Sequence, residues 1–377
     1  MSTRSRATAL LLAAAPLAAC ANTAADGAIY LGVAGPIQLP NGRGMHRAAE
    51  MAVEEINARG GVRGRRLALV VKDDEGRAER AIEVAAELRD DPRVVAVIGH
   101  INSAATLAAA KVYNDEARGV VEISPASSSP LITHAGPWTF RVCPSDLLHG
   151  PALARWAYER LGRRRAAVLY SNDEYGRGVL ETFAQAFERA GGTIVARDPY
   201  LTSLIDAETT LDPYLERAMR NGMDVLMIAG QADGGLRILA AARRLGYDGP
   251  VIGADGMTGI KDAGPIAEGV MVSSAFLPDR GTPAAREFVR AYQERYQELP
   301  DHRAAMTYDA VRLIARALEA VGPDRRALRD YLARVGQSEP AFEGVSGTIA
   351  FDANGDVASK EVYIGVVRGG RLVSAGS

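Results

Sequence analysis

Short apolar runs alternate with longer segments of helical period along most of the chain. The runs are rich in β-branched residues, and the first four cover residues 29–34, 67–71, 94–98 and 120–123. Continuous apolar runs of this length are typical of strands buried on both faces of a parallel sheet. Between them lie segments such as residues 44–57, in which apolar residues recur at helical spacing. This alternation predicts an α/β fold.

The same alternation starts again in the second half of the chain. Strands are expected at 166–170, 193–196 and 225–228, with helices at 176–190 and near 208–221. In both halves a Gly-Gly pair, at 60–61 and 191–192, ends a helix and leads into a strand. The repetition predicts two similar lobes, each a doubly wound parallel sheet.

The remaining C-terminal segment is too small to form a third domain. It is predicted to contain a strand at 269–276, helices at 283–297, 303–321 and 324–335, and strands at 347–351, 361–367 and 371–373. These elements are expected to complete the two lobes. The chain would then pass between the lobes more than once, which predicts a hinge of several strands.

The first twenty residues have the pattern of a secretory signal. Arg4 and Arg6 precede an apolar run at 7–19, which is too short to span a bilayer and ends at Cys20. Residues 17–20 (LAAC) match the lipobox of bacterial lipoproteins. We therefore expect residues 1–20 to be a lipoprotein signal peptide that ends at the lipidated Cys20. Residues 21–27 would be a flexible tether, and the protein would be anchored to a membrane in the periplasm or at the cell surface.

Composition excludes several other classes of protein. Residues 1–19 contain two of the 44 basic residues and no acidic residue, so 42 basic side chains remain against 46 acidic ones. The chain contains no block of basic residues of the kind that binds nucleic acid, so a nucleic-acid partner is not expected. Cys143 has no intramolecular partner once Cys20 is lipidated. The histidines are scattered without the spacing of metal ligands, so neither a metal nor a cofactor is expected. They are His46, His100, His134, His149 and His302.

Catalysis is also not expected. The chain lacks the G-x-S-x-G, H-E-x-x-H and Walker A motifs, and residues 32–35 lack the third glycine of a dinucleotide fingerprint. Asp73 and Asp74 are adjacent at the end of a strand, so their side chains point to opposite sides. A structural role as turn or cap residues fits them better than an acid/base pair.

Loops at the carboxyl ends of parallel strands are where a ligand is expected to bind. Residues 99–103 follow one strand and begin a helix, where Asn102 or Ser103 could cap the helix or bind a carboxylate. The serine-rich loop 124–130 follows the neighbouring strand and could supply further donors. In the second half, Asp255 lies in a glycine-flanked loop, where its carboxylate could organise a turn or bind an ammonium group.

Several segments together resemble the branched-chain amino acid type of bacterial periplasmic binding protein, which has the type I fold and serves ABC importers. The resemblance covers nearly all of the chain after Cys20. It is carried by residues 35–36, 52–64 (AVEEINARGGVRG), 71–74, 98–100, Ser103, 123–128 (ISPASS), 140–141, 173–178 (DEYGRG) and 308–310.

The resemblance implies a binding site and a domain organisation. Ser103, Ala126 and Ser128 would hold the carboxylate of an amino acid, and Asp255 its ammonium group. Tyr175 and Tyr308 would close over the ligand. Crossovers between the lobes are expected near 143–149, 276–281 and 352–360. The first lobe would comprise residues 28–145 and 278–355, and the second lobe residues 146–277 and 356–377.

Two positions depart from the pattern of leucine binders. Gln231 and Asn41 stand where aromatic residues occur in those proteins, so a more polar or a larger side chain than leucine is expected. The partners implied are a small ligand and the permease subunits of an importer, with the binding protein itself a monomer. Two alternatives remain open: a sensory module of the same fold, and a transport component that binds an amide, urea or an aromatic acid.

Overall fold

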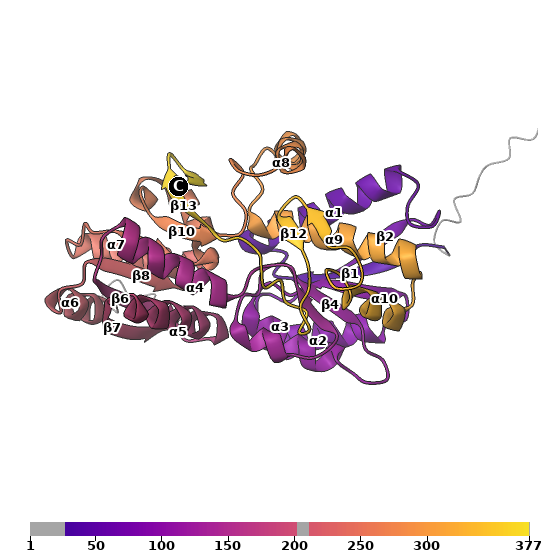
Figure 1. Cartoon of the computed structure of the whole chain (residues 1–377), viewed down its shortest axis with the longest axis horizontal. Coiled ribbons are helices and arrows are strands. Elements are labelled where there is room, and N and C mark those ends of the chain that lie inside the picture. Colours follow the sequence, from indigo (N-terminus) through magenta and orange to yellow (C-terminus); the bar gives the residue numbers. More distant parts are fainter. Residues whose placement is uncertain (1–26, 202–210, 377) are drawn as a thin grey trace, which may run out of the picture.

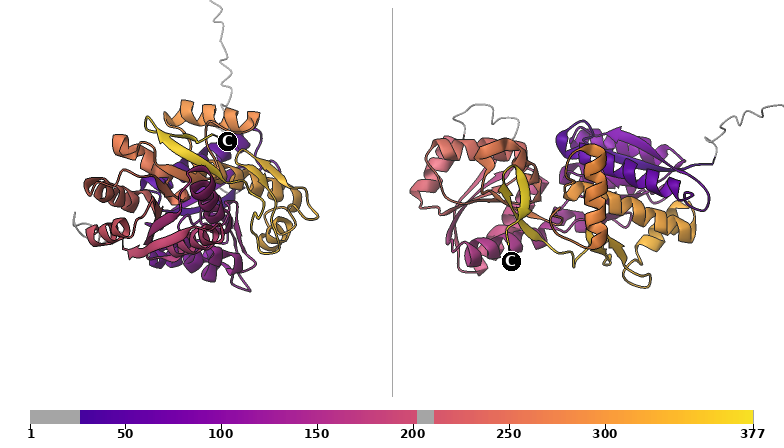
Figure 2. Two further views of the ribbon diagram at one scale, coloured as in Figure 1. Left: turned by 60° about the vertical axis from the view of Figure 1, so that its left-hand side comes forward. Right: turned by 90° about the horizontal axis from the view of Figure 1, so that it is seen from above.

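The structure is a computed structural model that describes residues 27–201 and 211–376. It contains two α/β lobes that lie side by side along the long axis of the molecule (Figures 1 and 2). One lobe is built on a five-stranded sheet of order β2-β1-β3-β4-β5. The other is built on a seven-stranded sheet of order β14-β13-β10-β9-β8-β6-β7. The predicted two-lobed α/β fold is confirmed.

The five-stranded sheet is parallel throughout. Its strands are β1 (Ile29–Gly35), β2 (Leu67–Asp73), β3 (Val94–Gly99), β4 (Val121–Ser124) and β5 (Thr139–Arg141). Leu31 and Val33 of β1 pack into one core cluster, and Ala34 packs into another. Successive residues of a strand point to opposite faces, so both faces of this sheet are buried.

Helices cover both faces of the first sheet. The two core clusters place α1 (Pro40–Ala58), α9 (His302–Val321) and α10 (Arg325–Leu332) on one face, and α2 (Ala78–Asp90) and α3 (Ser103–Tyr113) on the other. The helix α8 (Pro283–Tyr296) packs against the first group through Phe288, whose ring lies 4.8 Å from that of Tyr308.

The seven-stranded sheet is parallel except at one edge. The parallel strands are β6 (Arg165–Ser171), β7 (Thr193–Tyr200), β8 (Val225–Ala229), β9 (Val251–Gly253) and β10 (Met271–Ser274). The strands β13 (Tyr363–Arg368) and β14 (Arg371–Ser374) add to β10 as an antiparallel pair. The C-terminal end of the described chain therefore belongs to the second sheet.

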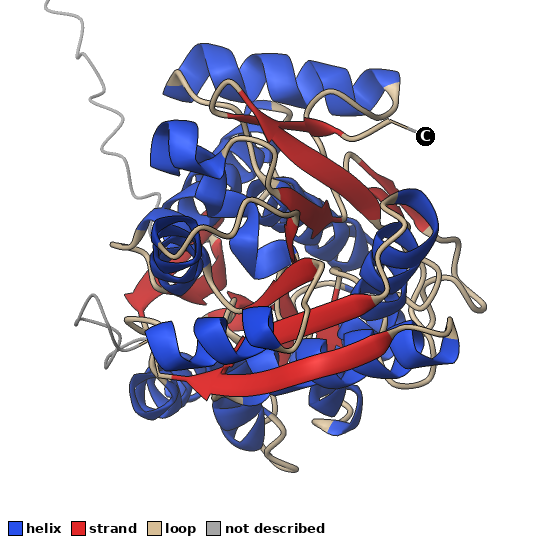
Figure 3. Cartoon of the chain, turned by 90° about the vertical axis from the view of Figure 1, so that its left-hand side faces the viewer, coloured by secondary structure: helices blue, strands red, loops and turns tan. Residues whose placement is uncertain are grey.

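Helices also cover the second sheet on both faces, as Figure 3 shows from the side of this lobe. One core cluster contains α4 (Asp146–Arg155), which continues into a π-helical turn, η2 (Trp156–Arg160), and α5 (Glu174–Arg189). The other contains α6 (Asp212–Arg220), α7 (Ala232–Arg244) and the 3-10 segment η4 (Asp255–Ala267).

The described chain crosses between the lobes three times. It leaves the first sheet after β5, returns after β10, and leaves again after the small hairpin of β11 (Phe342–Gly344) and β12 (Gly347–Ile349). A buried ion pair joins the third crossover to β5: Nε of Arg141 donates to Oδ1 of Asp356 at 2.6 Å, and Nη2 donates to Oδ2 at 2.7 Å. The predicted residue boundaries of the two lobes stay a prediction.

Several boundaries of the predicted elements were wrong. The first helix begins at Pro40 rather than at residue 44, because proline is tolerated at the first helical position, so Asn41 lies in the first turn of α1. The strand predicted at 347–351 ends at Ile349. The signal peptide, the tether residues 21–26 and Cys20 lie outside the described residues.

Candidate functional site

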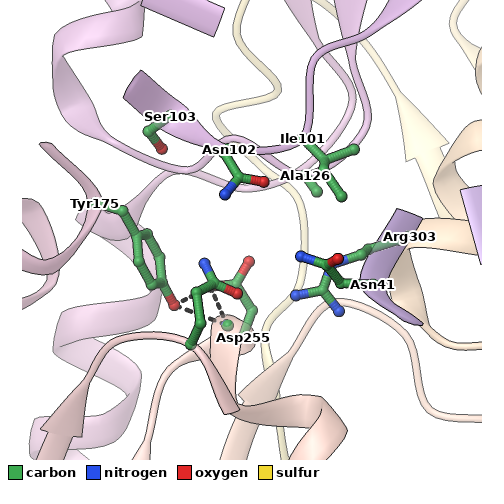
Figure 4. Close-up of a pocket in the computed structure, with 10 residues that line it drawn as sticks. Asn41, Ile101, Asn102, Ser103, Ala126, Tyr175, Asp255 and Arg303 are labelled. Carbon is green, nitrogen blue, oxygen red and sulfur yellow. Dashed lines mark hydrogen bonds between the residues drawn. The ribbon is translucent and has the colours of Figure 1, made fainter. Parts of the chain in front are cut away.

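A cavity lies between the two lobes, and the space between its wall atoms, part of which is open to solvent, is about 260 Å³. Both lobes contribute residues to its wall, mostly from loops at the carboxyl ends of strands and from the first turns of the helices that follow (Figure 4). The lining residues are Asn41, Ile101, Asn102, Ser103, Ala126, Tyr175, Gln231, Asp255, Gly256 and Arg303.

The start of α3 forms one wall. Its strand, β3, ends at Gly99, which has φ +138°, and a Cβ there would lie 2.1 Å from the carbonyl oxygen of Ala34. Only glycine fits this turn. Asn102 occupies the N-cap position, but its side chain makes no capping hydrogen bond. The capping role that was one expectation for Asn102 is therefore wrong, and the first amide groups of α3 remain uncapped by it.

The serine-rich loop packs against this turn. Oγ of Ser124 donates to the carbonyl oxygen of His100 at 2.6 Å, and Oγ of Ser127 donates to the same oxygen at 3.2 Å. The amide of Ser129 donates to Oγ of Ser103 at 3.3 Å. These serines join the two loops to each other, and Ala126 is the residue of this loop that reaches the cavity.

Ser128 lies behind the wall of the cavity. Its carbonyl oxygen accepts a hydrogen bond from the amide of Asp146 at 2.8 Å. Its hydroxyl is buried and has no partner among the residues that the structure describes. The structure does not bring Ser128 into the cavity with Ser103 and Ala126.

Asp255 forms the opposite wall, at the end of β9. It is 3% exposed, and its Oδ1 accepts a hydrogen bond of 2.9 Å from the hydroxyl of Tyr175. The amide of Gly256 donates to the same hydroxyl at 2.7 Å. Burial alone would raise the pKa of Asp255, but His149, His302, Arg303 and the Tyr175 hydroxyl hold its pKa below the usual value. The carboxylate is therefore charged at neutral pH.

Tyr175 stays protonated beside this carboxylate. Burial raises its pKa well above the usual value, and the charge of Asp255 raises it further. The phenol therefore acts as a donor to Asp255. Because both side chains belong to the second lobe, the carboxylate is held in place by its own lobe.

The start of α9 brings two residues to the site that were not predicted there. Arg303 lines the cavity, and His302 lies beside Asp255. Nη1 of Arg303 donates to Oγ1 of Thr258 at 3.1 Å, which joins the first lobe to η4 of the second. Nε2 of His302 lies 3.8 Å from Oδ2 of Asp255. Burial and the charge of Arg303 together lower the pKa of His302 to about 4, against the opposing effect of Asp301 and Asp255, so this imidazole is neutral at neutral pH.

One feature of the sequence indicates that His302 and Arg303 lie at the start of a helix. Asp301, which precedes them, caps α9 by accepting from the amide of Ala304 at 2.9 Å. An aspartate before a predicted helix marks its N-terminus, but no local pattern indicates that this N-terminus faces the loops of both sheets.

The structure places the other predicted residues as follows. Asn41 lies in the first turn of α1, and Gln231 lies at the N-cap of α7 without a capping hydrogen bond; both line the cavity. Tyr308 does not line it. Its hydroxyl donates to Oε2 of Glu55 at 2.6 Å within the first lobe.

The described residues provide no metal site and contain a free thiol at Cys143. No cluster of three or more histidine, cysteine, aspartate or glutamate side chains there could hold a metal ion. No described helix is both long and apolar enough to cross a membrane. Cys143 is a buried free thiol, and its Sγ lies 3.4 Å from the carbonyl oxygen of Ser127.

Comparisons with known proteins agree with this architecture. A family model described as periplasmic binding protein matches residues 28–371. A Pseudomonas aeruginosa protein named as a leucine-, isoleucine-, valine-, threonine- and alanine-binding protein is 29% identical over 345 residues, which cover 87% of each chain. A leucine-binding protein from Thermotoga maritima superposes with a TM-score of 0.84 at 28% identity, covering 92% of this chain and 98% of its own.

A substrate-binding protein of an ABC transporter from Desulfitobacterium hafniense, solved in complex with Leu, is 34% identical. It superposes with a TM-score of 0.80 and covers 92% of this chain and 99% of its own. Family match, sequence similarity and fold agree along nearly the whole described chain. The chain therefore belongs to the periplasmic binding protein family, in its branched-chain amino acid type with the type I fold.

Proposed function

We propose that this protein is the extracytoplasmic substrate-binding component of an ABC importer, and that it binds an amino acid in the cavity between its lobes. One observation carries the proposal: hydrogen-bond donors at the start of α3 and the buried carboxylate of Asp255 face one cavity from opposite lobes. The relatives, which are named as binding proteins for amino acids, support the same class of ligand.

The ligand's two charged groups have complementary partners in this cavity. The hydroxyl of Ser103, the backbone at Ala126 and the uncapped amides of α3 would hold the carboxylate, because the N-terminus of a helix favours negative charge. Asp255 would hold the ammonium group, with Tyr175 keeping the aspartate in place. The ligand would thus contact both lobes at once and favour the closed arrangement, since a ligand shifts an equilibrium toward the state that it binds better.

Delivery to a permease and attachment to a membrane are parts of the same proposal. Lipidation at Cys20 would keep the binding protein near the membrane, with residues 21–27 as a tether. A domain held in this way meets its permease at a high effective concentration. The protein acts by binding and release rather than by catalysis.

A thermal-shift screen tests the proposed function. The purified mature protein is heated with amino acids, amides, urea and aromatic acids, each in excess. A ligand at a hundred times its Kd stabilises the folded state by about 2.7 kcal/mol, so at least one amino acid is expected to raise the Tm by several degrees. A shift with an amide or an aromatic acid alone, and none with any amino acid, would replace the amino acid with that ligand class.

A further inference from the structure

Arg303 brings a buried positive charge to the cavity. Its side chain is 6% exposed, and it lies in the first turn of α9. Nη1 makes the hydrogen bonds that the structure gives this side chain, at 3.1 Å to Oγ1 of Thr258 and 3.1 Å to Oδ2 of Asp301. Nε and Nη2 have no partner among the described residues. Figure 4 shows Arg303 and Asn41 entering the cavity from the side opposite Tyr175.

The donors of Arg303 that have no protein partner, on Nε and Nη2, are accessible and not fully buried, so an acceptor that enters the cavity can reach them. Arginine carries five N–H donors in a planar fork, and a ligand that covered these donors without accepting from them would lose their hydrogen bonds to water. The fork matches a carboxylate, which it binds through two parallel hydrogen bonds. Asp301 satisfies only the Nη1 side and is also occupied as the cap of α9. The Nε and Nη2 side is therefore free for a ligand.

The other polar groups of the cavity suit the α-carboxylate and the ammonium group of an amino acid. The acceptor for Arg303 must therefore come from the ligand's side chain. Ser103 and the start of α3 suit the α-carboxylate, and Asp255 suits the ammonium group. Ile101 and Ala126 are the aliphatic residues of the wall, which is otherwise mostly polar. A leucine side chain directed at Arg303 and Asn41 would bury their donors without a partner, and a site built to hydrogen-bond a group discriminates strongly against ligands that lack it.

We infer that the site selects acidic amino acids, aspartate or glutamate, and that Arg303 is the residue that recognises their side-chain carboxylate. Asn41 lies beside Arg303 and donates to the same carboxylate from its amide. This inference rests on the proposed function, because it assumes that Asp255 and the start of α3 hold the α-amino and α-carboxylate groups.

Isothermal titration of the purified mature protein tests this selectivity. The ligands are L-glutamate, L-aspartate, L-glutamine, L-leucine and glutarate, which has both carboxylates of glutamate but no ammonium group. Glutamate or aspartate is expected to bind at least about tenfold more tightly than leucine or glutamine, the size of effect expected from one charge-assisted hydrogen bond. Leucine or glutamine binding as tightly as both acidic amino acids would overturn the inference.

Variants at Arg303 test whether this residue recognises the side-chain carboxylate of the ligand. Arg303→Met should weaken binding of the acidic amino acid about tenfold or more and should leave leucine binding no weaker. Arg303→Lys keeps the charge without the fork and should give a smaller loss. The matched control, Arg312→Met, changes an arginine of the same helix that packs over the ring of Tyr308 and does not line the cavity. Equal loss in Arg312→Met, or none in Arg303→Met, would overturn the role of Arg303.

The ligand panel separates this inference from the proposed function. Tight binding of leucine without binding of glutamate would leave the proposed function standing and overturn the inference. Glutarate binding as tightly as glutamate would show that the ammonium group contributes nothing, which overturns the proposed function while a carboxylate at Arg303 stands. Binding of none of the five ligands would overturn the inference. If Arg303→Met does not fold, the selectivity of the unaltered protein and the affinity of Arg303→Lys still test whether Arg303 recognises a side-chain carboxylate.

Discussion

The hydroxyl of Tyr175 donates a 2.9 Å hydrogen bond to Oδ1 of Asp255, and both residues come from the second lobe. The carboxylate is thus oriented before any contact with the first lobe is made. Groups that are held in position in advance lose less entropy when a ligand binds. In the proposed mechanism the second lobe carries a preformed ammonium site, and closure brings the carboxylate-binding start of α3 to the same ligand.

Replacing Ser103 by alanine should weaken amino acid binding by about tenfold, because a hydroxyl that donates to a carboxylate contributes roughly 1.5–3 kcal/mol. The matched control is Ser128→Ala, which removes a fully buried hydroxyl from behind the cavity wall. The affinity of Ser128→Ala should stay within about threefold of that of the unaltered protein, a change of about 0.7 kcal/mol or less, because this hydroxyl does not contact the ligand. Isothermal titration measures both. A larger loss in Ser128→Ala than in Ser103→Ala would contradict the proposed carboxylate site.

His302 should make the fold less stable in mild acid. Its pKa is about 4 in the folded protein, against an ordinary value of 6.5. Between these values the unfolded chain binds the proton and the folded protein does not, so stability falls as pH falls. From pH 7 to pH 5 the contribution of His302 is a loss of about 2 kcal/mol.

Urea denaturation at pH 7 and pH 5 measures this loss. His302→Gln should show a smaller decrease in the free energy of unfolding than the unaltered protein does. His46→Gln, which changes a partly exposed histidine of α1, serves as the control. The same pH dependence in His302→Gln and in the unaltered protein would show that His302 does not cause the decrease.

Arg141→Met should destabilise the fold by about 3–5 kcal/mol, because it leaves the charge of Asp356 buried without its partner. The pair joins β5 to the third crossover, and Arg141 is fully buried. Arg295→Met removes a more exposed pair with Glu54 and should cost under about 1 kcal/mol. Urea denaturation compares the two variants. Equal losses would mean that the buried pair contributes no more than a surface one.

Cys20→Ser should release the protein from the membrane fraction and abolish incorporation of labelled fatty acid, because lipid attachment requires the thiol. Cys143→Ser is the control, since Cys143 is buried and should not affect attachment. Fractionation of cells that express each variant tests this. Continued membrane association and labelling of Cys20→Ser would contradict the lipid anchor.

The central strands of both sheets could be predicted because they are buried on both faces, so residues such as Leu31 and Val33 stand in continuous apolar runs. The three-residue strands β5 and β11 were missed because they are too short to show a pattern. The lobes themselves followed from the repeated alternation of strands and helices.

The site could be predicted only in part. Ser103 and Asp255 were found because they follow strands, and the carboxyl ends of parallel strands meet at one edge of a sheet. Arg303 was missed because it reaches the cavity through a helix that returns to the first lobe from the second, which no local pattern encodes. Tyr308 was expected at the ligand, but its hydroxyl donates to Glu55 inside the first lobe.

The most direct test of the central claim is the affinity of Asp255→Asn for the amino acid that the thermal-shift screen identifies. The asparagine keeps an oxygen that can accept from Tyr175 but lacks the charge that holds the ammonium group. Isothermal titration should show a loss of about tenfold to a hundredfold, whereas Asp262→Asn, which changes an exposed aspartate of the same segment η4, should bind normally. Unchanged affinity in Asp255→Asn would contradict the account.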